Sequence, residues 1–179
     1  MVDGKVLIID ERKCTGCLLC VIACSVAHTG DIDLERAHIQ VWRTDEDRYV
    51  PLTCHHCETP SCVQACPTKA CHQDEATQRV LIDATKCIGC GTCVVACPFG
   101  HAHYDEVAGV SVKCDYCDGR VECVRVCEPK AISYVHSDDN YWVTRREVGL
   151  VKMAERLQPG GVLGVVVVPD GRPLEGELG

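Results

Sequence analysis

The stretch Cys14-Thr15-Gly16-Cys17-Leu18-Leu19-Cys20-Val21-Ile22-Ala23-Cys24 contains four closely spaced cysteines, and three similar quartets follow it along the chain. The four spacings are Cys14-x2-Cys17-x2-Cys20-x3-Cys24, Cys54-x2-Cys57-x4-Cys62-x3-Cys66, Cys87-x2-Cys90-x2-Cys93-x3-Cys97 and Cys114-x2-Cys117-x5-Cys123-x3-Cys127. Together they account for all but one of the 17 cysteines in a chain of 179 residues. Most of what the sequence predicts about fold and function follows from this arrangement.

Two other roles for such cysteines have to be weighed against iron–sulfur ligation. Structural zinc sites usually take their four ligands from two separated Cys-x2–4-Cys pairs, whereas each pair here is followed closely by a third and a fourth cysteine. A disulfide framework needs an oxidising compartment. No secretory segment is visible, and 17 is an odd number of cysteines. Three thiolates from one short loop suit three corners of an iron–sulfur cubane.

Quartets one and three carry the bacterial ferredoxin spacing for a [4Fe–4S] cluster, in which the fourth cysteine serves the other cluster of a pair. At four thiolates per cluster, the four quartets predict four [4Fe–4S] clusters as the cofactors. A small chain with four one-electron centres is expected to conduct electrons.

The composition agrees with a metal-supported fold. Aromatic residues make up only 4% of the chain, so a conventional apolar core would be thin. Metal–ligand bonds then supply folding free energy that apolar burial does not. We therefore expect the chain to be largely unfolded without its clusters.

The charge restricts the class of partner. The formal net charge is −8, and four oxidised clusters, each carrying −2 with its thiolates, would add about −8 more. Such an acidic protein is not expected to bind nucleic acid or anionic membranes, but partners with a basic docking face. No segment approaches the roughly 20 apolar residues of a membrane span. We expect a cytoplasmic protein without direct membrane insertion, or one exported with a signal-bearing partner.

The first and third quartets lie in a repeated strand, loop and helix unit. Strands are predicted at Val6–Ile9 and Val80–Ile82, and short helices are predicted to begin at Val21–Ala23 and Val94–Ala96. Further strands are predicted at Ile39–Trp42 and Ala131–Val135, with a hairpin over residues 101–113.

Turn residues mark the cluster loops of the repeat. Gly16 and Gly89 stand one residue before the second cysteine, where glycine lets the backbone approach a sulfur closely. Pro67 and Pro98 follow the fourth cysteine and turn the chain away. Ser25 replaces that proline in the first quartet.

The C-terminal part differs from the rest. Trp142–Leu157 is predicted to be an amphipathic helix that ends at Pro159, and a strand-like run follows at Val162–Val168. We divide the chain into a four-cluster region, 1–140, and a docking or assembly tail, 141–179. The tail either packs back on this chain or docks on another chain, with strand addition or self-association as the means.

The chain resembles the four-cluster ferredoxin subunits of multisubunit redox enzymes over about residues 5–135. The resemblance rests on Cys14-Thr-Gly-Cys17, on the Cys54-His-His-Cys57 to Cys66-Pro67 stretch and on Cys87-Ile-Gly-Cys90 to Cys97-Pro98-Phe-Gly. It implies an α+β fold of two nested bacterial-ferredoxin-like modules, a polyferredoxin. The inner module would span about 50–100, and the outer module would combine 1–30 with 110–135.

The resemblance also implies which cysteines share a cluster, with the clusters in a row. Cluster A would take Cys14, Cys17, Cys20 and Cys127. Cluster B would take Cys114, Cys117, Cys123 and Cys24. Cluster C would take Cys54, Cys57, Cys62 and Cys97. Cluster D would take Cys87, Cys90, Cys93 and Cys66. The spacing by itself supports an exchange of fourth ligands without indicating which quartets exchange them.

Some residues outside the quartets have two readings. Cys71 is either a buried small side chain, or an alternative ligand or redox thiol. The histidines at positions 55, 56, 101 and 103 are either plain loop residues or groups that tune a cluster potential or couple it to protons. The lysines at positions 13, 86 and 113 precede a first cysteine. They are either solvated or close enough to favour the reduced cluster.

No nucleotide loop, nucleophile–base pair or substrate motif is visible, so we expect a non-catalytic electron-transfer subunit. It would relay single electrons between a catalytic subunit and an external carrier, a flavin subunit or a further ferredoxin subunit. A tungsten or molybdenum aldehyde oxidoreductase is the favoured partner type, with hydrogenase, formate dehydrogenase and carbon monoxide dehydrogenase as alternatives. A freestanding soluble ferredoxin and a wire subunit that also scaffolds an oligomer are the competing hypotheses.

Overall fold

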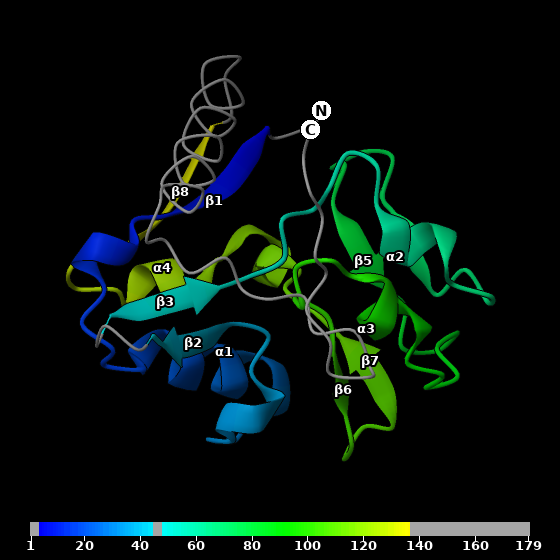
Figure 1. Cartoon of the computed structure of the whole chain (residues 1–179), viewed down its shortest axis with the longest axis horizontal. Coiled ribbons are helices and arrows are strands. Elements are labelled where there is room, and N and C mark those ends of the chain that lie inside the picture. Colours follow the sequence, from blue (N-terminus) through cyan, green and yellow to red (C-terminus); the bar gives the residue numbers. More distant parts are fainter. Residues whose placement is uncertain (1–3, 45–47, 137–179) are drawn as a thin grey trace, which may run out of the picture. The chain divides into compact units, whose positions relative to one another are not determined.

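The fold is given by a computed structural model that describes residues 4–44 and 48–136 (Figure 1). These residues belong to one compact unit, Met1–His136. The predicted C-terminal helix Trp142–Leu157 and strand-like run Val162–Val168 lie outside the described residues. The described elements are, in chain order, β1 Lys5–Ile9, η1 Glu11–Lys13, α1 Leu19–Thr29, η2 Leu34–Arg36, β2 Gln40–Arg43, β3 Tyr49–Leu52, α2 Ser61–Gln64, β4 Cys71–Gln73, β5 Val80–Ile82, α3 Thr92–Ala96, β6 His103–Asp105, β7 Val110–Val112, η3 Tyr116–Gly119, α4 Glu122–Arg125 and β8 Ile132–His136.

Every sheet among the described residues is a pair of antiparallel strands: β1 with β8, β2 with β3, β4 with β5 and β6 with β7. Pairs this small are marginally stable unless something packs against them. The prediction of a mixed helix and strand fold is confirmed. The predicted hairpin over 101–113 is confirmed as β6 and β7.

The two ends of the described chain meet in one sheet. Strand β1 pairs with β8 along its whole length, from Lys5 opposite His136 to Ile9 opposite Ile132. The amide of Asp10 continues the pairing by donating to the carbonyl of Ala131 at 2.8 Å. Helix α1 contacts α4 in the same part of the molecule. Sequence positions that lie far apart are therefore brought together around quartets one and four.

The central part of the chain is built from neighbouring segments. Strands β4 and β5 form a hairpin, and the short helices α2 and α3 contact each other. The strand predicted at Ile39–Trp42 is found one residue later, as β2. Its partner β3 was missed, because Pro51 within Tyr49–Leu52 argues against a strand on sequence grounds.

Helix α1 is longer than the sequence predicts. It has 11 residues, whereas α2, α3 and α4 have 4, 5 and 4. Ser25 explains the difference, because the other quartets have a proline just beyond the fourth cysteine that stops the helix. The fully buried Ser25 hydroxyl also donates to the Asp31 carbonyl and accepts from the Asp33 amide, both at 2.8 Å. It thus fixes the turn that follows α1.

The apolar core is small. The only large aliphatic side chains below 2% exposure among the described residues are Ile39, Val80 and Ile132. Around Ile39 and Ile132, the buried cluster consists largely of cysteines and of small or aromatic residues. The prediction of a thin core is confirmed.

The two glycines of the loop Cys87–Cys93 give a test of the packing. Gly89 and Gly91 have nearly the same backbone angle, φ of +68° and +69°, which disfavours a side chain at either position. A Cβ at Gly89 would lie 2.7 Å from the Gly109 carbonyl oxygen, whereas a Cβ at Gly91 would meet nothing within 4 Å. We expect Gly91→Ala to lower the unfolding free energy by about 1–2 kcal/mol, from the backbone alone.

Gly89→Ala should cost about 1–3 kcal/mol more, because the carbonyl must also move. Thermal unfolding of the anaerobically prepared proteins measures both. Equal losses in the two variants would contradict the close approach of Gly89 to Gly109.

Candidate iron–sulfur sites

One cavity gathers three cysteines of quartet one with the last cysteine of quartet four. It is lined by Cys14, Cys17, Cys20 and Cys127, together with apolar side chains such as Ile132. The first two cysteines lie in the loop before α1, Cys20 lies in α1 itself, and Cys127 follows α4. Burial, with the nearby thiols of Cys14, Cys17 and Cys127, raises the pKa of Cys20 to about 12.

A second cavity gathers three cysteines of quartet two with the last cysteine of quartet three. It is lined by Cys54, Cys57, Cys62 and Cys97, and by ring side chains that include Phe99 and His101. Cys54 and Cys57 lie between β3 and α2, Cys62 lies in α2, and Cys97 directly follows α3. The short helices place the third and fourth cysteines of one quartet toward different sites.

The other cysteines of quartet four lie close to Cys24. Burial, with the nearby thiols of Cys24 and Cys117, raises the pKa of Cys123 to about 12. Burial also raises the pKa of Cys114, and Cys123 and Cys24 are again among the neighbouring thiols. Thiols held this far from ionisation must lose their protons when they bind iron.

The cysteines of quartet three lie close to Cys66. A hydrogen bond with the Thr92 hydroxyl lowers the pKa of Cys90, whereas the nearby Cys66 acts to raise it. Burial raises the pKa of Cys93, with Cys87 also acting in that direction. Cys90 and Cys17 are the two exposed cysteines of the described chain.

Backbone amides point at sulfur atoms in several of these groups. The donor and acceptor pairs are His38 N to Cys24 Sγ at 3.2 Å, His56 N to Cys54 Sγ at 3.4 Å, Cys71 N to Cys66 Sγ at 3.3 Å and His101 N to Cys97 Sγ at 3.4 Å. Such donors stabilise the negative charge of cluster-bound thiolates. None of the 17 cysteines is in a disulfide. The groups therefore fit [4Fe–4S] clusters, which exchange single electrons when bound.

Cys71, the cysteine outside the quartets, is 1% exposed and lies in β4. The prediction of a buried small side chain is confirmed. A hydrogen bond between the two thiols lowers the pKa of Cys62 and raises the pKa of Cys71. Its own amide donates to Cys66. It thus lies against ligand candidates of two different groups.

The four predicted histidines are held in place rather than left as loose loop residues. His55 and His101 face each other with 3.2 Å between their Nε2 atoms, and His55 also packs edge-on against Phe99. His56 accepts a hydrogen bond from the Val80 amide at 3.0 Å through Nδ1. His103 is largely buried, and burial lowers its pKa. Whether these rings tune a cluster potential or couple it to protons stays a prediction.

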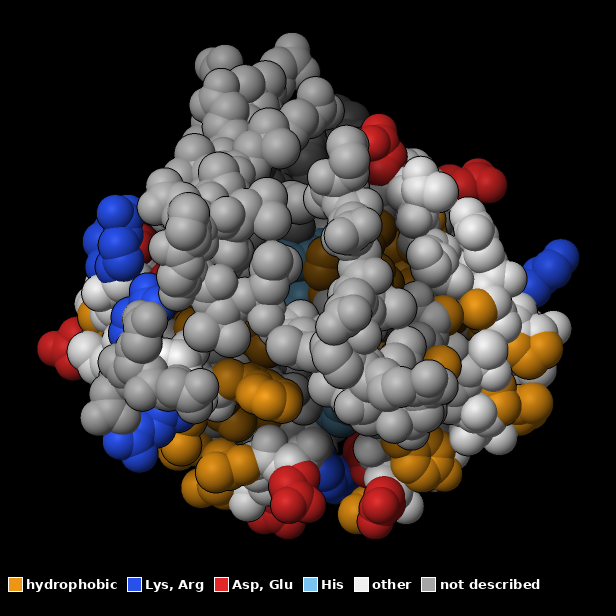
Figure 2. Space-filling model, viewed as in Figure 1, with side chains coloured by type: hydrophobic (Ala, Val, Ile, Leu, Met, Phe, Trp, Pro, Cys, Tyr) orange, Lys and Arg blue, Asp and Glu red, His pale blue; other side chains and the backbone are white. Residues whose placement is uncertain are grey.

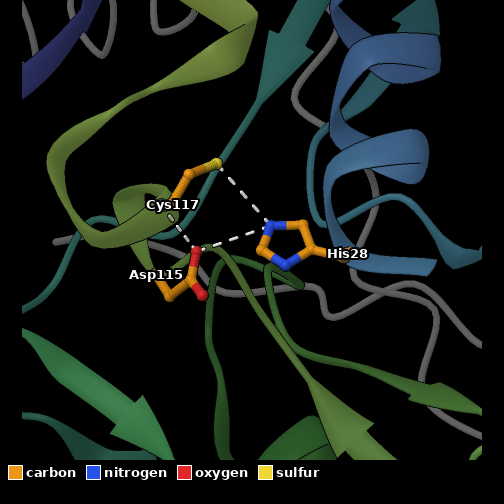
Figure 3. A group of neighbouring side chains, drawn as sticks. All are labelled: His28, Asp115 and Cys117. Atoms are coloured by element: carbon orange, nitrogen blue, oxygen red, sulfur yellow. Dashed lines mark hydrogen bonds and ion pairs between the residues drawn. The ribbon is translucent and has the colours of Figure 1, made fainter. Parts of the chain in front are cut away.

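The sequence analysis missed His28, which Figure 3 shows with Asp115 and Cys117, and it also missed His38. Nε2 of His28 lies 3.7 Å from Cys117 Sγ and 3.5 Å from Asp115 Oδ1, and these ligand atoms lie within 4.8 Å of one another. The His28 ring stacks on His38 with 3.8 Å between centroids. One signal was available, because His28 is four residues beyond Cys24 and so lies on the same helix face. This group belongs to the site of quartet four.

The three lysines before the first cysteines are not equivalent. Lys13 and Lys86 are exposed and pair with Asp10 and Asp83 three residues earlier, at 3.5 and 2.9 Å. Lys113 is 4% exposed. The prediction of a solvent-exposed lysine fits Lys13 and Lys86 and is wrong for Lys113.

Comparison with known proteins identifies the family. A 4Fe-4S dicluster domain matches residues 46–137, and a second 4Fe-4S dicluster domain matches residues 6–67. The chain belongs to the 4Fe-4S dicluster family. The first of these domains alone spans half of the chain, and the two overlap across quartet two.

Curated relatives of this dicluster protein are subunits of redox complexes. The polyferredoxin-like subunit of aliphatic sulfonate oxidoreductase from Pyrococcus furiosus is 41% identical over 68% of this chain and 70% of its own length. The electron transfer subunit PhsB of thiosulfate reductase from Salmonella typhi is 34% identical over 83% of this chain and 85% of its own length. One subunit of the anaerobic dimethyl sulfoxide reductase of Escherichia coli is 33% identical over 73% of both proteins.

These relatives confirm the prediction of a non-catalytic electron-transfer subunit with [4Fe–4S] clusters, of the kind found in oxidoreductase complexes. Within residues 4–44 and 48–136, no helix has the length and apolar character needed to cross a membrane.

The exchange of fourth ligands can be tested with paired substitutions. Cys97→Ser should alter the same paramagnetic resonance signal as Cys57→Ser, because both side chains line one cavity. Cys66→Ser should likewise alter the same signal as Cys90→Ser. If Cys97→Ser instead changes the signal that Cys93→Ser changes, each quartet serves its own cluster and the exchange is wrong.

Cys71→Ala tests whether the remaining cysteine is a ligand. We expect iron and acid-labile sulfide contents equal to those of the unmodified protein, because Cys71 is buried in β4, outside the four quartets. The loss of a buried side chain should lower the unfolding free energy by about 1 kcal/mol. Cys62→Ala is the control and should lose iron. A loss of iron from Cys71→Ala as large as that from Cys62→Ala would make Cys71 a ligand.

Proposed function

We propose that this chain relays single electrons through four [4Fe–4S] clusters, held by the sixteen quartet cysteines, between a catalytic redox subunit and an external carrier or second subunit. The observation that carries the proposal is that two cavities each gather three cysteines of one quartet with the last cysteine of another. The nearness of Cys24 to Cys123 and of Cys66 to Cys90 supports two further sets of the same kind. The sets are those that the family resemblance implies, clusters A to D. The chain's part is to hold, insulate and electrostatically bias these centres.

The order of the four sets is also part of the proposal. Thiols of neighbouring sets lie close enough to act on each other's pKa. Cys20 of set A is among the groups that act on Cys123 of set B. Cys54 of set C acts on Cys114 of set B. Cys62 of set C acts on Cys93 of set D. The nearness of these thiols supports a row in the order A, B, C, D.

The two ends of such a row would be the places where electrons enter and leave. Cys17 of set A and Cys90 of set D are exposed, whereas the cysteines of sets B and C are buried or half-buried. Exposed apolar side chains flank both ends, with Leu19 at 45% beside set A and Ile88 and Val95 at 67% and 89% beside set D. Hydrophobic side chains are scattered among charged ones on the face in Figure 2. Apolar contacts beside an exposed ligand suit docking of a redox partner.

The nested arrangement of two ferredoxin-like modules is proposed on the same grounds. Pairing of β1 with β8 and contact of α1 with α4 support an outer module built from both ends of the region. Pairing of β4 with β5 and contact of α2 with α3 support an inner module from its middle. The tail, 141–179, is proposed as a docking or self-association segment.

For the catalytic partner we propose a large subunit with a tungsten or molybdenum cofactor, of the aldehyde-oxidising type. Hydrogenase, formate dehydrogenase and carbon monoxide dehydrogenase types are the alternatives. The curated relatives are subunits of enzymes for aliphatic sulfonate, thiosulfate and dimethyl sulfoxide. The purified complex should therefore also be assayed with these three substrates. A cytoplasmic location stays a prediction of the sequence.

Native purification under anaerobic conditions tests the proposal. We expect this chain to co-elute at fixed stoichiometry with a large metal-containing subunit, which mass spectrometry identifies. The complex should hold about sixteen iron atoms per copy of this chain. Elution as a brown monomer without a partner would make the protein a diffusible carrier.

A truncation ending at residue 140 tests the tail by the same purification. The truncated chain should keep its iron but lose the large subunit, if 141–179 docks on it. A truncated chain that still co-elutes with its partner at the original ratio would remove the tail from the interface. The full-length chain prepared in parallel is the control.

A further inference from the structure

Lys113 is the only buried lysine of residues 4–44 and 48–136. It follows β7 and directly precedes Cys114, so its backbone belongs to the loop of quartet four. Its side chain instead reaches the loop of quartet two. The lysines at the corresponding positions of quartets one and three are exposed, with side-chain exposures of 57% for Lys13 and 63% for Lys86.

All three hydrogens of the Lys113 ammonium group have an acceptor. Nζ donates to Cys54 Sγ at 3.1 Å, to the Val80 carbonyl and to the Cys114 carbonyl at 3.3 Å. An ammonium group has three donors and no acceptor, so its hydrogen bonding is complete. The side chain is therefore fixed in one place between the two loops.

Among the described residues, the sulfur of Cys54 is the candidate counter-charge in contact with this ammonium. No carboxylate of the described residues lies within ion-pair distance of Lys113 Nζ, and nearby Asp105 is paired with Arg36 at 2.9 Å. A buried cation without a counter-charge is strongly unfavourable. Cys54, whose Sγ lies 3.1 Å from Nζ, would supply negative charge as a thiolate when it binds iron. The burial of Lys113 is thus suited to a chain whose quartets hold iron.

The position of Lys113 is a junction between two sets of cysteines. Its Nζ donates to the sulfur of Cys54, which belongs to set C, and to the backbone carbonyl of Cys114, which belongs to set B. Cys54 and Cys114 also lie near each other. In the row proposed above, sets B and C are the two central clusters. This inference rests on that proposed function.

We propose that Lys113 is a fixed positive charge that raises the reduction potentials of the two central clusters and so couples the two halves of the relay. Reduction at either site adds one electron and no proton, and therefore one negative charge beside the ammonium. In a buried setting of low dielectric this attraction favours the reduced form. It also offsets the repulsion that an electron meets in a chain of formal net charge −8.

Redox titration of the full-length loaded protein, followed by paramagnetic resonance, tests the proposal. In Lys113→Met, two of the four reduction potentials should fall by at least about 59 mV each. For a one-electron step, this shift corresponds to a tenfold decrease in the equilibrium constant for reduction. The other two should stay in place. The matched control is Lys86→Met, which removes the same charge one residue before a first cysteine and should shift no potential.

Lys113→Arg separates charge from packing. It keeps the positive charge, so it should retain potentials close to those of the unmodified protein. Unchanged potentials in Lys113→Met, or equal shifts in Lys113→Met and Lys86→Met, would overturn the proposal. Neither result would contradict the relay if iron analysis and titration still show four reducible clusters. An unmodified protein with fewer than four reducible clusters would contradict the relay itself.

A measurement on the unmodified sequence covers the case in which the variants do not load iron. Protein labelled with 15N only at lysine Nζ is reduced with dithionite and examined by pulsed paramagnetic resonance. The N–H to sulfur contact at 3.1 Å predicts a 15N coupling on a reduced cluster. The absence of any lysine coupling would place Lys113 away from the cluster ligands and overturn the proposal.

Discussion

The gathering of cysteine thiols into tight sets is the constraint on which the rest of this structure depends. In residues 4–44 and 48–136, few large aliphatic side chains are fully buried between the four two-stranded sheets and the four α-helices. Short helices and glycine turns bring sulfur atoms together, and the backbone amides aimed at them leave little freedom in the connecting loops. A protein built in this way obtains its stability from ligands as much as from apolar contacts.

The quartets are copies of one unit, but each copy has been adapted. Ser25 lets the first helix continue to Thr29, and this extension carries His28 to Cys117. The lysine before quartet four turns inward, whereas its counterparts before quartets one and three pair with an aspartate at the surface. Such differences give each site its own electrostatic surroundings while the ligand spacing stays almost constant. Proteins that move electrons through several like centres use surroundings of this kind to set the potential of each centre.

Much of the fold was predictable because its signals are local. The strands at Val6–Ile9 and Val80–Ile82, and the hairpin over 101–113, follow from apolar runs and turn residues. Strand β3 was not predictable, because a proline within a run, here Pro51, argues against a strand on sequence grounds. The burial of Lys113 and the contacts of His28 and His38 could not be read from spacing. They depend on which loops meet in space, and a side chain next to a cysteine in sequence can point toward a different quartet.

The pairing of β1 with β8 joins the beginning of this region to its end, whereas β4 to β7 pair with immediate neighbours. Polypeptides emerge from the ribosome from the N-terminus at about 5–20 residues per second. The middle of the region can therefore close while synthesis continues. The N-terminal strand and the first quartet must wait for the last strand to appear. We therefore expect folding during synthesis to begin in the middle of this region, and the cysteines of quartet one to be left longest without their final neighbours.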